Sequence, residues 1–335
     1  MRKILMIFVV LICIVGGVFV ILWESGMFGE SAGGRRSVDN DITEKSPDVS
    51  DNADAADKTT SETIDPNADE KPVDTTETTE DAVSELVDKT MAEMSLHDKV
   101  CQMMFVTPEG LTGTDDVMVA GDATKQALQA YPVGGIIYFA NNFDNVDQTR
   151  DMISNTQSYS KIGLFIATDE EGGRVNRIMD TLGTTYIGPM YDYKDDGPDA
   201  AFENAKTIAS DMSALGFNLD FAPVADVWSN PDNTVIGDRA YSDDYAQAAE
   251  LVGSAVKGFQ DGGVICTLKH FPGHGDTAED SHYSSAYVNR TKAQIMADEM
   301  QPFRTGIDAG AELVMVGHLI VPDIDELPST LSYKL

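Results

Sequence analysis

VICTLKHFPGHG, residues Val264–Gly275, joins a short apolar run directly to a group of cationic, glycine and histidine residues. The run Val264–Leu268 carries no charge, as expected of a strand that is buried on both faces of a parallel sheet. Lys269 and His270 follow it at once. Because parallel α/β folds bind ligands beyond the carboxyl ends of their strands, this stretch predicts both the fold class and the place of a site.

The same arrangement recurs along the chain. The other apolar runs are Gly135–Phe139, Leu164–Thr168, Asn218–Ala222 and Leu313–Val316. Helix-like sequence follows each run after a polar or glycine-rich loop, for example at Ala246–Gln260. This repetition predicts an α/β fold of the (β/α)8 TIM-barrel type. An open doubly wound sheet is the competing fold, although no glycine-rich nucleotide fingerprint supports it.

The composition excludes several classes of partner. The chain has a net charge of -33 and a pI near 4.2. Such a chain lacks the basic surface that binds nucleic acid or anionic lipid headgroups, so we expect no nucleic-acid partner. Only Cys101 and Cys266 fall in the predicted folded part, both in apolar surroundings, which indicates two buried free thiols.

The first 81 residues differ from the rest. Ile4–Trp23 is an uncharged apolar run of 20 residues, long enough to cross a bilayer as a helix. We therefore expect a signal-anchor over residues 1–24 that holds the protein at the membrane with its folded part outside the cell. Cleavage near Ser31–Gly34 would instead secrete the protein.

A tether and a folded domain should follow the anchor. Between Asp39 and Asp81 there are 15 acidic and 3 basic residues and few large apolar ones, so residues 25–81 are predicted to be a disordered linker. Residues 82–335 are predicted to form the folded domain. Val83–Met104 already has helical spacing of apolar residues, and Ser95 begins a pattern typical of a capping box.

Three interpretations of His270, His274 and His282 compete. A zinc site needs several converging ligands, and the sequence has no HExxH-like spacing, so we expect no metal and no organic cofactor. A structural role suits His274 in its loop. Acid–base chemistry suits His282, because Asp280 lies two residues before it and its carboxylate could orient the ring.

The stretch Lys269–His282, KHFPGHGDTAEDSH, resembles the signature of the family 3 glycoside hydrolases. Its ending is similar to that of the β-N-acetylhexosaminidase branch, which includes bacterial β-N-acetylglucosaminidases that trim peptidoglycan fragments. Three further segments agree: Met94–Met104 (MSLHDKVCQMM), Asp169–Arg177 (DEEGGRVNR) and Ile236–Tyr241 (IGDRAY). The resemblance covers about Ala82–Leu335.

The resemblance implies roles for individual residues. Asp169 is expected to accept hydrogen bonds from sugar hydroxyls, with Arg177 in the same pocket. Arg239, Lys269 and His270 are expected to complete the sugar-binding group.

The resemblance also implies a catalytic pair. His282 is expected to be the general acid/base, with Asp280 holding its tautomer, in place of one carboxylate of the usual retaining scheme. The family's nucleophile is an Asp on a later strand, expected beyond Leu335, so we expect the barrel of this chain to be truncated. Asp323 and Asp325 do not follow an apolar strand and do not fit that role.

The leading hypothesis is hydrolysis of terminal non-reducing β-N-acetylglucosamine from cell-wall glycans or muropeptides. A β-glucosidase or a phosphorylase of the same family is an alternative within the enzyme class. The alternative from another class is a membrane-tethered, non-catalytic sugar-binding protein.

Overall fold

The computed structural model of the chain describes residues 75–278 and 286–335. Contacts divide these residues into two units, helix α2 (Thr75–Glu93) and the segment Met94–Leu335. The predicted anchor and the linker up to residue 74 lie outside the described residues. Within the described part, no helix combines the length and apolarity needed to cross a membrane.

Helix α2 spans the predicted boundary between the linker and the folded domain. It begins at Thr75, seven residues before that boundary, and it belongs to a different unit from Met94–Leu335. Its apolar residues are exposed, among them Val83 at 60% and Leu86 at 63%. Apolar residues at helical spacing indicate one apolar face, but they do not indicate what that face packs against. The domain boundaries stay a prediction.

Six parallel strands form the sheet of the second unit, in the order β1-β2-β3-β4-β5-β7. They are β1 (Phe105–Val106), β2 (Gly135–Ile137), β3 (Phe165–Thr168), β4 (Leu219–Asp220), β5 (Ile265–Phe271) and β7 (Leu313–Val316). A separate parallel pair joins β6 (Ala286–Tyr287) to β8 (Leu319–Ile320).

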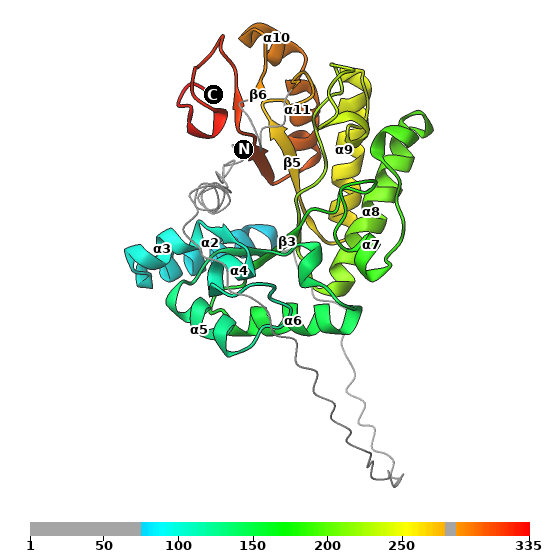
Figure 1. Cartoon of the computed structure of the whole chain (residues 1–335). Helices are drawn as coiled ribbons and strands as arrows, with labels where there is room; N and C mark the ends of the chain where they lie inside the picture. Colours follow the sequence, from blue (N-terminus) through cyan, green and yellow to red (C-terminus); the bar gives the residue numbers. More distant parts are fainter. Residues whose placement is uncertain (1–74, 279–285) are drawn as a thin grey trace, which may run out of the picture. The chain divides into compact units, whose positions relative to one another are not determined.

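Helices connect the strands of the sheet (Figure 1). The helices are α3 (Leu96–Gln102), α4 (Pro108–Thr112), α5 (Asp122–Ala130), α6 (Val146–Tyr159), α7 (Met179–Leu182), α8 (Pro198–Leu215), α9 (Tyr245–Asp261), α10 (Lys292–Ala297) and α11 (Met300–Ala309). Short 3-10 turns are η1 (Ala140–Asn142), η2 (Met190–Asp196), η3 (Gly237–Arg239) and η4 (Ser329–Leu331). Strands and helices alternate through β2, α6, β3, α8, β4, α9, β5, α11 and β7. The α/β prediction is therefore confirmed, and the unit forms part of a (β/α)8 barrel.

The central strands β2, β3 and β4 are buried on both faces, as their apolar runs predicted, whereas all residues of β1 and β7 are partly buried. Ile136 and Ile166 pack in the large core with the helices. Their neighbours Ile137 and Ala167 pack in a second cluster with Phe221, on the other face of the sheet. Successive strand residues point to opposite faces, so this division places one core between sheet and helices and the other inside the curved sheet.

Local sequence explains several element ends and contacts. The predicted capping box is confirmed, because the Ser95 side chain accepts from the Asp98 N–H and the Asp98 carboxylate accepts from the Ser95 N–H. Helices α8 and α9 approach closely at Gly258, where an added Cβ would lie 2.3 Å from the Phe202 carbonyl oxygen. Only glycine allows the two helices to lie this close.

The longest strand reaches the polar residues that follow its apolar run. The run Val264–Leu268 is predicted to be a strand. Strand β5 extends beyond this run to Phe271, so Lys269 and His270 lie near the carboxyl end of the strand. The prediction of two buried free thiols at Cys101 and Cys266 is confirmed. Burial raises the pKa of the Cys266 thiol to about 12, so this thiol is not ionised at neutral pH.

Candidate active site

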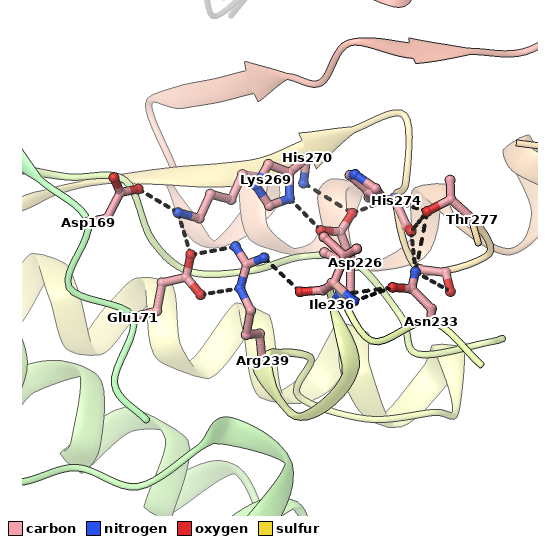
Figure 2. Close-up of polar contacts among 12 residues, drawn as sticks. Asp169, Glu171, Asp226, Asn233, Ile236, Arg239, Lys269, His270, His274 and Thr277 are labelled. Carbon is pink, nitrogen blue, oxygen red and sulfur yellow. Dashed lines mark hydrogen bonds and ion pairs between the residues drawn. The ribbon is translucent and has the colours of Figure 1, made fainter. Parts of the chain in front are cut away.

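Polar segments meet beyond the carboxyl ends of β3, β4 and β5. Asp169 and Glu171 follow β3, Asp226 lies in the segment after β4, and Lys269 belongs to the end of β5. Arg239 closes η3 and points toward the same group (Figure 2). Neighbouring parallel strands end at one edge of the sheet, and this brings residues from distant parts of the sequence together.

The Lys269 ammonium is buried between two carboxylates. Its side chain is 2% exposed, and Nζ lies 2.8 Å from Asp169 Oδ1 and 2.5 Å from Glu171 Oε1. Burial by itself would lower the pKa of Lys269, but the two carboxylates raise it above its ordinary value. Lys269 is therefore charged and held in one position.

The Arg239 guanidinium forms a bidentate ion pair with Glu171. Nε lies 2.7 Å from Oε2, and Nη2 lies 2.7 Å from Oε1. A further hydrogen bond runs from Arg239 Nη1 to the Val235 carbonyl oxygen at 3.0 Å. Burial opposes the charge of Glu171, but Lys269 and Arg239 hold the pKa of this carboxyl well below its usual range.

Asp226 holds His270 by both its backbone and its ring. Asp226 Oδ1 accepts from the His270 N–H at 3.1 Å, and Oδ2 lies 2.6 Å from His270 Nδ1. Burial lowers the pKa of His270 to about 4. Burial opposes the charge of Asp226, but the contacts with His270 and His274 hold the pKa of this carboxyl below its usual value. At neutral pH the ring is therefore uncharged, carries its proton on Nδ1, and presents Nε2 as an acceptor.

Asp169 has an oxygen to offer to a ligand. Its side chain is 18% exposed, and Oδ1 accepts from Lys269 Nζ. The second oxygen, Oδ2, has no hydrogen-bond partner among the described residues. Together with His270 Nε2 it supplies acceptors, while Lys269 and Arg239 supply donors. Because a hydroxyl group both donates and accepts, this group of side chains suits a ligand that carries several hydroxyls.

Arg177 is held separately, by the segment that follows β3. Glu170 is buried, and its carboxylate accepts from the backbone N–H groups of Arg177 at 2.6 Å and Ile178 at 2.9 Å. The Arg177 guanidinium lies over the Phe139 ring, 5.8 Å from its centroid. Within the described part of the chain, no hydrogen bond or ion pair joins Arg177 to Lys269.

Asn233 ties together the two loops that carry the site. Its Nδ2 donates to the carbonyl oxygens of His274 at 2.8 Å and Gly275 at 3.2 Å, and its Oδ1 accepts from the Ile236 N–H at 3.0 Å (Figure 2). An added Cβ at Gly275 would lie 1.6 Å from the Val227 carbonyl oxygen, so the loops meet only because this residue is glycine.

The structure brings together four of the residues predicted to bind a ligand, namely Asp169, Arg239, Lys269 and His270. Arg177, the fifth, lies in the segment after β3, where its guanidinium contacts the Phe139 ring and the Asn176 carbonyl oxygen. The predicted catalytic pair, Asp280 and His282, lies outside the described residues. In residues 75–278 and 286–335, no group of three or more His, Cys, Asp or Glu side chains is placed to hold a metal ion.

Two residues of the site were not predicted from the sequence, Glu171 and Asp226. Glu171 lies in the acidic run directly after β3, where the resemblance implies a sugar-binding role for Asp169 and none for Glu171. Asp226 is the one charged residue of the apolar stretch Phe221–Trp228 (FAPVADVW), and a carboxylate in such a stretch is a signal of a buried polar partner.

The comparisons with known proteins agree with this geometry. The profile of the glycosyl hydrolase family 3 N-terminal domain matches residues 95–335. Beta-hexosaminidase A of Pseudoalteromonas piscicida is 36% identical over 235 residues, which cover 63% of this chain and 39% of that protein. The beta-hexosaminidase of Chromobacterium violaceum is 37% identical over 228 residues, which cover 64% of this chain and 63% of that protein.

A solved structure gives the same result. The glycoside hydrolase family 3 beta-N-acetylglucosaminidase from Paenibacillus sp. str. FPU-7 superposes with a TM-score of 0.66 and 36% identity, over 71% of this chain and 45% of that one. The chain thus spans less than two thirds of the length of these relatives. With a family profile matched across its whole second unit, this chain belongs to glycosyl hydrolase family 3.

Proposed function

We propose that this protein hydrolyses terminal non-reducing β-N-acetylglucosamine residues, with fragments of peptidoglycan as its substrates. The observation that carries the proposal is the group formed by Asp169, Arg239, Lys269 and His270 at the strand ends. Its donors and acceptors are fixed by buried partners and match the hydroxyls of an uncharged sugar. The relatives named as beta-hexosaminidases and a beta-N-acetylglucosaminidase support the choice of sugar.

The acid–base step is assigned to His282. In a retaining mechanism one group protonates the leaving oxygen and then activates the water that releases the sugar. An imidazole with an ordinary pKa near 6.5 exchanges a proton readily at neutral pH. Asp280, two residues earlier, would accept from the ring and keep the other nitrogen facing the glycosidic oxygen.

The same mechanism takes a carboxylate nucleophile, and two carboxylates that follow β8 are already engaged elsewhere. Asp323 Oδ2 accepts from the Lys292 backbone N–H at 2.8 Å, and Asp325 Oδ2 accepts from Ser332 Oγ at 2.9 Å. Neither is proposed as the nucleophile.

The proposed place of action is outside the cell membrane. The apolar run Ile4–Trp23 would anchor the protein, and the acidic segment up to residue 74 would hold the folded part away from the bilayer. A protein so placed would meet glycans of the cell wall. Cleavage of the run would release the same activity into the medium.

The test is hydrolysis of an aryl β-N-acetylglucosaminide by the full-length protein and by a His282→Ala variant. We expect turnover that falls at least about 100-fold in the variant, which is the usual contribution of a general acid/base. His97→Ala is the matched control, because the His97 side chain is 54% exposed on α3. An aryl β-glucoside, and inorganic phosphate with analysis for the sugar 1-phosphate, separate the glucosidase and phosphorylase alternatives.

The outcomes distinguish the hypotheses. Turnover that is equal in the wild type and in His282→Ala would remove the histidine from the mechanism. Binding of N-acetylglucosamine without any turnover by the full-length protein would instead support a tethered sugar-binding protein.

A further inference from the structure

Glu171 lies at the centre of the site without reaching its surface. The Glu171 side chain is 1% exposed, compared with 18% for that of Asp169. Its two oxygens contact Lys269 of β5 and Arg239 of η3, which are 98 and 68 residues away in the sequence. Both oxygens are therefore occupied by the protein's own cations. A ligand that touches the exposed Asp169 has no free atom of Glu171 to bind.

The contacts of Glu171 decide which donors remain for a ligand. A lysine ammonium has three N–H groups, and those of Lys269 meet Asp169 and Glu171, which leaves one. An arginine guanidinium has five, and Arg239 uses two on Glu171 and one on the Val235 carbonyl oxygen, which leaves two. These remaining donors have fixed directions because the others are committed.

Glu171 also balances the charge of the two cations. Arg239 and Lys269 share the oxygen Oε1, at 2.7 Å and 2.5 Å, so the two positive groups lie close together in a buried place. Without the carboxylate they would repel each other, and each would carry the cost of a buried charge with fewer partners. Among the described residues Asp169 forms an ion pair with Lys269 and none with Arg239, so it cannot serve both.

The backbone around Glu171 is itself fixed. The Glu171 N–H donates to the Val175 carbonyl oxygen at 2.9 Å. At Gly173 an added Cβ would lie 2.8 Å from Pro189 Cα, which keeps the turn packed against the next segment. The carboxylate is thus held from its own side as well as by its partners.

We propose that Glu171 is a positioning residue, which holds the Lys269 ammonium and the Arg239 guanidinium at a fixed spacing and aims their remaining N–H groups at the sugar hydroxyls. This inference rests on the proposed function, since it concerns binding of the same sugar. It assigns to Glu171 no contact with substrate.

The test compares Glu171→Gln with Glu109→Gln in the full-length protein, with kcat and KM measured on an aryl β-N-acetylglucosaminide. Glu109 is a matched control, because its carboxylate also ties segments together, accepting from the Val117 N–H at 3.0 Å, while no hydrogen bond or ion pair among the described residues joins it to Lys269 or Arg239. We expect kcat/KM to fall about 100-fold in Glu171→Gln, as for other misplaced binding groups, and to hold in Glu109→Gln.

The titration of Lys269 gives a readout that a merely structural role would not move. The Asp169 and Glu171 carboxylates raise the pKa of Lys269 against the opposing effect of burial. In Glu171→Gln the ammonium loses one carboxylate, so we expect the midpoint of the Lys269 titration, followed by NMR of ¹³Cε-labelled lysine, to move to lower pH. In Glu109→Gln the midpoint should stay where it is in the wild type.

A double-mutant cycle with Arg239→Met tests whether Glu171 acts through Arg239. We expect the double variant to lose less activity than the product of the two single losses, because both changes remove the same pair. Strictly multiplicative losses, together with an unmoved Lys269 midpoint in Glu171→Gln, would overturn the inference.

Failure of the proposed function is distinguishable from failure of this inference. If the wild type hydrolyses no N-acetylglucosaminide, the Lys269 ammonium is titrated by NMR of ¹³Cε-labelled lysine in the same proteins. A midpoint that falls in Glu171→Gln and holds in Glu109→Gln supports the inference even then. Equal midpoints in all three proteins would overturn it.

Discussion

The Asp226 carboxylate fixes both the position and the tautomer of His270. Oδ2 lies 2.6 Å from the ring nitrogen Nδ1, and Oδ1 accepts from the His270 backbone N–H at 3.1 Å. The His274 N–H also donates to Oδ1, at 2.7 Å. One buried carboxylate thus holds three donors, two at the end of β5 and one in the turn after it, and it leaves His270 Nε2 as the ring nitrogen available to a ligand.

Replacing Asp226 by asparagine should remove the hydrogen bond that favours the Nδ1–H tautomer of His270. The amide has one acceptor instead of two, and its NH2 group would face a donor, so the Nδ1–H tautomer loses its partner. We expect kcat/KM to fall at least about 100-fold, by analogy with the loss of the orienting carboxylate of a catalytic triad. The measurement is steady-state kinetics, with the exposed Asp232→Asn as control. Unchanged kinetics in Asp226→Asn would show that the tautomer of His270 does not matter for turnover.

A second buried carboxyl lies behind the same turn. Glu299 is 1% exposed, its Oε1 accepts from Tyr245 Oη at 3.0 Å, and Oε1 lies 3.5 Å from Arg290 Nη1. An added Cβ at Gly273 would lie 2.9 Å from Oε2, which has no hydrogen-bond partner in the described part of the chain. Burial raises the pKa of Glu299 to about 7, although Arg290 and Tyr245 oppose the shift.

The raised pKa of Glu299 predicts that the free energy of unfolding falls as the pH rises toward neutrality. Its pKa is raised from 4.5 to about 7 in the folded state. Its contribution is therefore complete below pH 4.5, decreases as pH rises, and is lost above about pH 7. At 1.36 kcal/mol per pKa unit the loss amounts to about 3 kcal/mol.

The measurement is the free energy of unfolding in urea between pH 4 and pH 8, for the wild type and for Glu299→Gln, whose amide resembles the protonated acid. We expect the variant to lose less stability than the wild type across this range. The exposed Glu250→Gln serves as control and should follow the wild type. A wild-type curve parallel to that of Glu299→Gln would contradict the prediction.

The close approach of α8 and α9 makes Gly258→Ala destabilising. In an ordinary helix this change would stabilise by about 1 kcal/mol, because alanine is the better helix former. Here the added Cβ would lie 2.3 Å from the Phe202 carbonyl oxygen and 3.0 Å from Ala205 Cβ. We expect a net loss of about 1–3 kcal/mol, typical of an overpacked core. The measurement is urea unfolding, with Gly163→Ala as control, since nothing lies within 4 Å of a Cβ there.

The parts of the fold that the sequence predicts are those with long apolar runs. Strand β7 occupies the whole predicted run Leu313–Val316, and β5 begins one residue inside its own. Strands β1, β6 and β8 span two residues each and, unlike the equally short β4, lie outside the predicted apolar runs. They form because neighbouring strands provide partners for them, which is information from the folded chain.

The site is predictable only in part for a similar reason. Lys269 and His270 directly follow an apolar run, and this local feature locates them at a strand end. The partners of Glu171 and Asp226 lie 44 to 98 residues away in sequence, so their pairing depends on which strand ends become neighbours. Nothing in the local sequence distinguishes Glu171 from the adjacent Glu170, which instead accepts from backbone N–H groups.

Arg177 provides the sharpest test of a role implied by resemblance alone. Its guanidinium lies over Phe139 and donates from Nη1 to the Asn176 carbonyl oxygen at 3.2 Å, and its buried Nε has no partner within residues 75–278 and 286–335. A buried N–H without a hydrogen-bond partner costs free energy, and a ligand that accepts a hydrogen bond from this N–H would remove that cost. We therefore expect Arg177→Met to raise KM about tenfold with a smaller change in kcat. Arg150→Met is the control, since the exposed Arg150 of α6 donates from Nε to the Ala214 carbonyl oxygen at 2.9 Å. A KM that stays unchanged in Arg177→Met would show that Arg177 does not bind the sugar.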